Sequence, residues 1–161
     1  MKFKSEKGFT GIDITVAIIV ILLFMSLISV IFFNITKSSK SIDRKSEATY
    51  IATTLIESFK AKDYDDVIVT DDYVKIKNIK NDIGKDIVAY EVGGQNIEIT
   101  DTMQIKDGYT CTTRIYTYVP EDQSAQTEKN DLVKVIAVKV EYKVGNEKKD
   151  VELTTSIVRK F

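Results

Sequence analysis

Few side chains in this sequence have the types and spacing that catalytic chemistry requires. There is no histidine, which excludes His-based acid–base catalysis and His-ligated metal sites. Cys111 is the single cysteine, so the chain forms no intramolecular disulfide and has no cysteine cluster for zinc. It lies in a Thr- and Tyr-rich stretch with no histidine to activate it, and we expect a small core residue rather than a nucleophile. We therefore expect neither enzymatic activity nor a cofactor.

A group of aspartates could in principle bind calcium, which takes several oxygen ligands from a flexible loop. The run lacks the Asp-x-Asp-x-Asp-Gly order of a calcium loop, and carboxylates beside a helix end are usually only solvated. Solvated carboxylates are the favoured interpretation, and we predict no metal site, with calcium as the alternative. The residues are Asp63, Asp65, Asp66, Asp71 and Asp72.

Asp13 is the acidic residue with the most unusual position, because it stands at the start of a long apolar run. From Ile14 through Phe33 there is no charge, proline or glycine. As a helix, these roughly 20 residues extend about 30 Å, enough to cross the hydrocarbon core of a bilayer. A carboxylate at the edge of a membrane is costly unless it is paired, so Asp13 is a candidate functional residue.

A cleavage site is expected before the apolar run rather than after it. A secretory signal is cleaved beyond its apolar region at small residues. Here the small residue at the boundary between charge and apolar sequence is Gly8, which follows Lys7 and precedes Phe9. Cleavage there removes residues 1–8 and leaves the apolar helix on the mature protein.

The order Lys7-Gly8-Phe9-Thr10-Gly11-Ile12-Asp13, followed by the apolar run, resembles the start of a type IV prepilin, the family of pilins and secretion pseudopilins. The resemblance implies cleavage between Gly8 and Phe9 by a prepilin peptidase, N-methylation of Phe9, and a role of the Asp13 carboxylate in assembly. Family members usually carry glutamate where this chain has Asp13, and commonly leucine where it has Gly11.

The resemblance also implies a function and a location. We expect a structural subunit, a minor pilin rather than a major one, of a type IV pilus, a secretion pseudopilus or a DNA-uptake filament. Its partners are then the prepilin peptidase, other pilin subunits and the cytoplasmic membrane, with the N-terminus inside and the head outside before assembly. A weaker resemblance, at Leu153–Ile157, is to the minor pilins called pilus-modification proteins. The alternative is an uncleaved bitopic protein with an extracellular binding or sensor domain.

The remaining sequence predicts an α+β fold with three parts: a leader (1–8), a transmembrane and assembly segment (9–36) and a globular head (37–161). Apolar residues at spacings of three and four continue the helix to about Lys62. These residues are Ala48, Ile51, Ala52, Leu55, Ile56 and Phe59. This long N-terminal helix should pack on an antiparallel sheet, as in pilins.

Alternating apolar residues beyond Lys62 predict the strands. A hairpin with a turn at Gly93-Gly94 joins 87–92 to 97–100, and another with a turn at Gly145-Asn146 joins 136–144 to 151–157. Shorter signals mark strands at 73–77 and 109–119. Residues 121–131 are polar without periodicity and predict a mobile loop.

Two surface features allow a binding function but do not require it. The cations between Lys37 and Lys45 could contact anionic lipid or DNA, although a solvated helix face is favoured. Tyr109, Tyr116 and Tyr118 could form an exposed patch, although cross-strand packing is favoured. With 23 basic and 24 acidic residues, the chain has no strong nucleic-acid signal.

Overall fold

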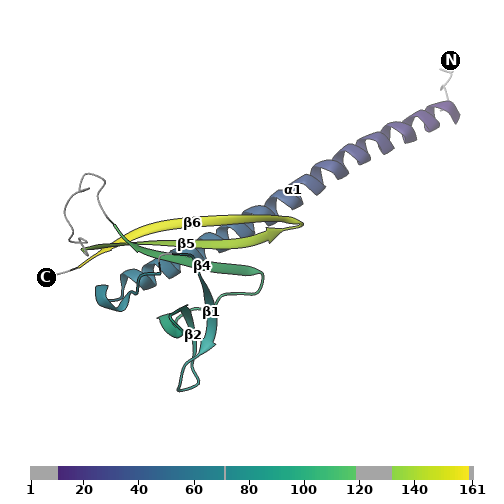
Figure 1. Ribbon diagram of the computed structural model, residues 1–161. Coiled ribbons are helices and arrows are strands. Elements are labelled where there is room, and N and C mark those ends of the chain that lie inside the picture. Colours follow the sequence, from purple (N-terminus) through teal and green to yellow (C-terminus); the bar gives the residue numbers. More distant parts are fainter. Residues whose placement is uncertain (1–10, 71, 119–131, 160–161) are drawn as a thin grey trace, which may run out of the picture. The chain divides into compact units, whose positions relative to one another are not determined.

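The computed structural model describes residues 11–70, 72–118 and 132–159 (Figure 1). One long helix, α1 (Gly11–Lys60), is followed by a single 3₁₀ turn, η1 (Tyr64–Asp66), and then by strands only. The strands are β1 (Val74–Lys80), β2 (Asp86–Val92), β3 (Gln95–Thr100), β4 (Tyr109–Thr117), β5 (Val133–Val144) and β6 (Glu147–Val158).

The six strands form one antiparallel sheet in the order β3-β2-β1-β4-β5-β6. Both predicted hairpins are confirmed. Gly93 and Gly94 have φ angles of 58° and 80°, the positive values that a tight two-residue turn between right-twisted strands requires. In the second hairpin Val144 pairs with Glu147, so that Gly145-Asn146 is the turn, and all twelve residues of β6 pair with β5.

The second half of α1 packs on one face of this sheet and confirms the predicted α+β architecture. Its apolar stripe is buried at Ala48, Ile51, Ala52, Leu55 and Phe59, with Ile56 partly buried against the same core. The sheet contributes the inward side chains of each strand, which in β5 are Ile136, Val138, Val140, Tyr142 and Val144. The ring of Phe59 lies 5.8 Å from that of Tyr90, tilted by 57°, so helix and sheet meet through an aromatic pair.

The chain divides into two compact units, residues 1–41 and 42–161, and α1 contributes to both. The Ser/Lys-rich stretch 36–41 does not interrupt the helix. The helix ends at Lys60 instead of Lys62, because the Lys62 N–H bonds to the Phe59 carbonyl three residues back and tightens the last turn. The predicted loop at 121–131 lies outside the described residues.

Candidate functional site on the first half of helix α1

The first half of α1 exposes apolar side chains on every side. All residues from Gly11 to Lys40 are exposed, including each large apolar residue between Ile12 and Ile35. Within the described part of the chain, α1 is the one helix that is long and apolar enough to cross a membrane. A helix that is apolar all round requires an apolar environment, which lipid or other apolar helices can provide.

The three hydroxyl groups of the apolar run from Ile14 to Phe33 are satisfied within the helix itself. Thr15 donates a hydrogen bond to the Gly11 carbonyl at 2.9 Å, and Ser29 donates to the Met25 carbonyl at 2.8 Å. Ser26 bonds the Leu23 carbonyl in the same way, at 2.8 Å. Because these hydroxyls need no water, they add little to the cost of placing the segment in lipid or between helices.

Asp13 differs from these residues in carrying a charge. It lies in the first turn of α1, where the helix dipole favours a negative charge, and it is the only charged side chain from Gly11 to Thr36. The predicted processing residues Gly8 and Phe9 lie outside the described residues, so the cleavage site remains a prediction.

The chemical candidates in the head have mainly structural roles. Cys111 is buried in the core, and burial raises the pKa of its thiol to about 12, as expected of a core residue rather than a nucleophile. Among the aspartates considered for calcium, Asp65 pairs with Arg159, whereas Asp71 lies outside the described residues. In the part of the chain that the structure describes, no group of three His, Cys, Asp or Glu side chains could hold a metal ion.

The three tyrosines considered together do not form one patch. Tyr109 is buried facing α1, with its ring 6.3 Å from that of Tyr142, as cross-strand packing predicts. Tyr116 lies on the opposite face of β4, where the Arg114 guanidinium is 5.1 Å from the centre of its ring, and Tyr118 is half exposed. The group is split because alternate residues of a strand point to opposite faces.

A clamp between α1 and residues 106–109, which include the start of β4, was not anticipated. Glu47 of α1 accepts hydrogen bonds from Lys106 and from the Tyr109 hydroxyl, the latter at 2.6 Å. These two bonds hold the pKa of the Glu47 carboxyl below its ordinary value. Arg44, one helical turn earlier, lies 5.5 Å from the centre of the Tyr109 ring. The sequence contained one indication that Glu47 faces the sheet: it precedes the buried stripe residue Ile51 by four residues and so lies on the same side of the helix.

A buried lysine was also missed. Lys134 of β5 donates hydrogen bonds to the carbonyls of Tyr64 and Val67, at 2.8 and 2.9 Å, and its ammonium lies 4.0 Å from the centre of the Tyr64 ring. It thereby fixes the turn η1 against the sheet. The alternation of β5 could have indicated this burial. Lys134 lies two and four residues before the inward residues Ile136 and Val138, so its side chain is on the same face of the strand.

Comparison with known proteins found no match: no family model, no curated protein and no solved structure matches this chain.

Proposed function

We propose that this chain is a structural subunit of a type IV pilus or a related filament, stored in the membrane and then assembled through its N-terminal helix. The observation that carries the proposal is the contrast within α1. The first half exposes apolar side chains in every direction, and the second half of the same unbroken helix forms the core of the head. A helix of this kind is stable in lipid, and afterwards in a bundle of equivalent helices.

Asp13 has a specific role in this proposal. After cleavage behind Gly8, the new N-terminus is the amine of Phe9, four residues before Asp13 in the sequence. A neighbouring subunit displaced along the filament by about one helical turn can present its amine to this carboxylate. The opposite charge compensates the burial of Asp13 among apolar helices. Processing requires a prepilin peptidase, and no catalytic role is proposed for the chain itself.

The decisive experiment compares Asp13→Asn with Asp13→Glu. The membrane and shear-released filament fractions are both blotted for the subunit. We expect Asp13→Asn to be processed and to stay in the membrane, but to enter filaments several-fold less well than the original chain. Asp13→Glu keeps the charge and should enter at least as well. Equal incorporation of the asparagine variant would show that the charge pair is dispensable.

The alternative, an uncleaved bitopic receptor, makes a different prediction about the N-terminus. If the chain is a pilin, N-terminal sequencing of the native protein should begin at Phe9. Replacing Gly8 with a bulky residue should then leave a precursor that is eight residues longer and remains in the membrane. A native protein that begins at Met1 or Lys2 would favour the receptor and contradict the pilin proposal.

A further inference from the structure

The outer edge of β6 carries a row of backbone groups that point away from the sheet. Among the described residues, β6 is the last strand of the sheet order and pairs only with β5 (Figure 1). Just beyond β6, the Arg159 N–H donates a hydrogen bond to the Leu132 carbonyl. The backbone groups of residue 159 therefore point toward the β5 side, and those of its neighbour Val158 point away from it. Since the direction alternates along an antiparallel strand, the N–H and C=O groups of Thr154, Ser156 and Val158 point outward.

The second half of β6 carries in its own residues none of the usual protection against strand pairing. From Glu147 to Glu152 the strand carries five charged side chains, whereas Leu153–Val158 has none and is rich in β-branched residues. It also contains no proline or glycine. Natural sheets protect exposed edges with charge, proline or bulges, and an unprotected edge is a template for another strand.

The opposite edge of the sheet, β3, has a regular part at Gln95–Glu98, because its register with β2 shifts between Glu98 and Thr100. Glu98 is the only charged residue of this strand. The tight turn before it makes Val92 and Gln95 exchange hydrogen bonds, so the backbone groups of Asn96 and Glu98 point outward.

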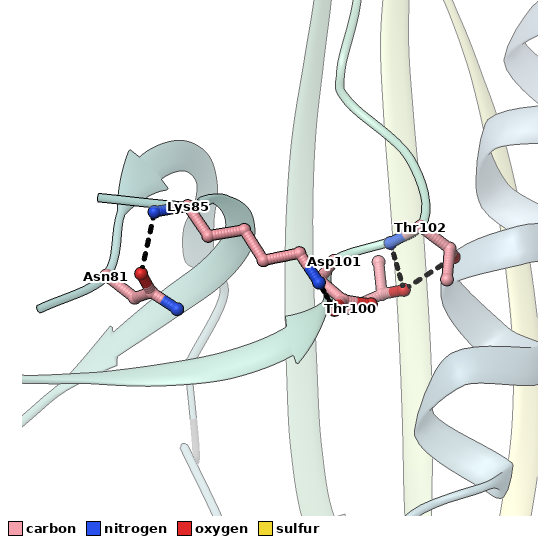
Figure 2. Close-up of polar contacts among 5 residues, drawn as sticks. All are labelled: Asn81, Lys85, Thr100, Asp101 and Thr102. Carbon is pink, nitrogen blue, oxygen red and sulfur yellow. Dashed lines mark hydrogen bonds and ion pairs between the residues drawn. The ribbon is translucent and has the colours of Figure 1, made fainter. Parts of the chain in front are cut away.

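The end of β3 is held in place by polar contacts (Figure 2). Lys85, in the turn before β2, forms an ion pair with Asp101, directly after β3. Thr100 accepts a hydrogen bond from the Thr102 N–H at 3.2 Å, and the hydroxyls of these two threonines lie 2.8 Å apart. These contacts hold the end of β3 to the turn before β2.

The topology then determines how two copies can meet. Six antiparallel strands alternate in direction, so β3 and β6, at the two ends of the order, run in opposite directions. When two copies lie in the same orientation, β6 of one can therefore pair antiparallel with β3 of the next and continue the sheet. Pairing of β6 with another β6 requires copies in opposite orientations, which a filament of parallel subunits excludes.

We propose that the edge of β6 at Leu153–Val158 is a docking site for β3 of a second copy of this chain. The proposal rests on the proposed function, because the parallel orientation of subunits comes from it. The partner binds by adding its strand to the sheet, in a head-to-tail contact between two adjacent copies.

The side chains permit this pairing. In both edge strands, the residues with outward backbone groups place their side chains on the face opposite α1. One register sets Ser156 opposite Glu98 and Ile157 opposite Ile97, so that no like charges face each other. On the α1 side, a hollow of about 570 Å³ lies between β6 residues 156–158 and the segment 60–66, beside this half of the edge.

The first test is a disulfide between copies. In the full chain, Ser156→Cys and Glu98→Cys are combined, because opposite residues of an antiparallel pair lie within disulfide reach. The buried Cys111 should give little background. Mild oxidation of membrane and filament fractions should give products of two or more chains. Each single variant is the control, and neither should form the dimer.

Absence of the double-variant product from both fractions would overturn the proposal, as would equal cross-linking by Ser156→Cys alone, which indicates pairing of two β6 strands. These outcomes differ from failure of the proposed function, in which the original chain never enters filaments.

A second test removes one outward N–H. Ser156→Pro deletes a donor that β5 does not use, so the head should stay folded while the cross-link or the incorporation falls at least several-fold. Ser156→Ala keeps the N–H and should behave like the original chain. Thr155→Pro deletes a bond to β5 and should unfold the strand. A folded Ser156→Pro variant that assembles normally would contradict docking at this edge.

Discussion

Lys134 shows how one residue fixes a turn that has little core of its own. Its ammonium satisfies two backbone carbonyls of the segment 64–67 while its stem lies inside the head. Lysine suits this position because a flexible stem can carry several donors to a point between two carbonyls. The turn is held by a side chain from a strand about 70 residues later.

Lys134→Met keeps most of the stem and removes the donors. The two carbonyls then lose their partner, and we expect the free energy of unfolding to fall by about 1–3 kcal/mol. The measurement is a denaturant melt in mild detergent, followed by tyrosine fluorescence. Lys139→Met on the same strand removes only surface pairs with Glu141 and Asp150 and should cost less than about 1 kcal/mol. Equal losses in the two variants would mean that the carbonyl contacts of Lys134 contribute nothing.

Glu47 should make the clamp between α1 and residues 106–109 sensitive to acid. Its pKa in the folded state lies below the ordinary value of 4.5, so the carboxylate contributes stability above that value. This contribution is lost as the pH falls through the lowered pKa. Glu47→Gln should therefore flatten the dependence of stability on pH below about 4.5. Thermal melts across this range test the expectation, and parallel curves for both proteins would contradict it.

At the scale of the element, α1 is one helix with two different environments. Its first half has no inward face, whereas its second half buries one stripe against the sheet and leaves Tyr50 exposed on the other side. No proline or glycine separates the halves after Gly11.

Phe59→Ala tests the packing of α1 on the sheet. The ring is completely buried, and deleting it should destabilise the head by about 3–5 kcal/mol through lost burial and a residual cavity. Tyr50→Ala, on the exposed side of the same helix, should change the stability by no more than about 0.5 kcal/mol. A loss below about 1 kcal/mol for Phe59→Ala in a denaturant melt would show that helix and sheet are not packed as described.

At the scale of the whole molecule, the compact unit 42–161 contains the complete sheet and the buried stripe of α1. Its core needs no residue of the apolar segment. The head can therefore fold without the apolar first half of α1.

We expect a fragment from Lys37 to Phe161 to be soluble and folded. It should be monomeric at micromolar concentration, because one short strand contact is small compared with a stable interface. Size-exclusion chromatography with light scattering measures the mass, and circular dichroism reports the mixed helix and strand content. An insoluble or unfolded fragment would show that the head depends on the first half of α1.

The sequence by itself determined the local elements. The apolar run, the stripe of α1 and the alternation in β5 each have a period that reports which side chains share a face. The glycine pairs located both hairpin turns, because few other residues adopt their backbone angles. The unusual position of Asp13 was also visible from its charge alone.

Only the tertiary structure decided which strands become neighbours. β1 pairs with β4 across more than 30 residues, and the Thr70 N–H bonds the Ile115 carbonyl at 2.8 Å, yet no local period encodes either pairing. The partners of Lys134 and Glu47 depended on those pairings in the same way. The edge strands could be identified only after every strand pairing was known, because an edge strand has a neighbour on one side only. Chain order alone does not specify which distant segments become neighbours.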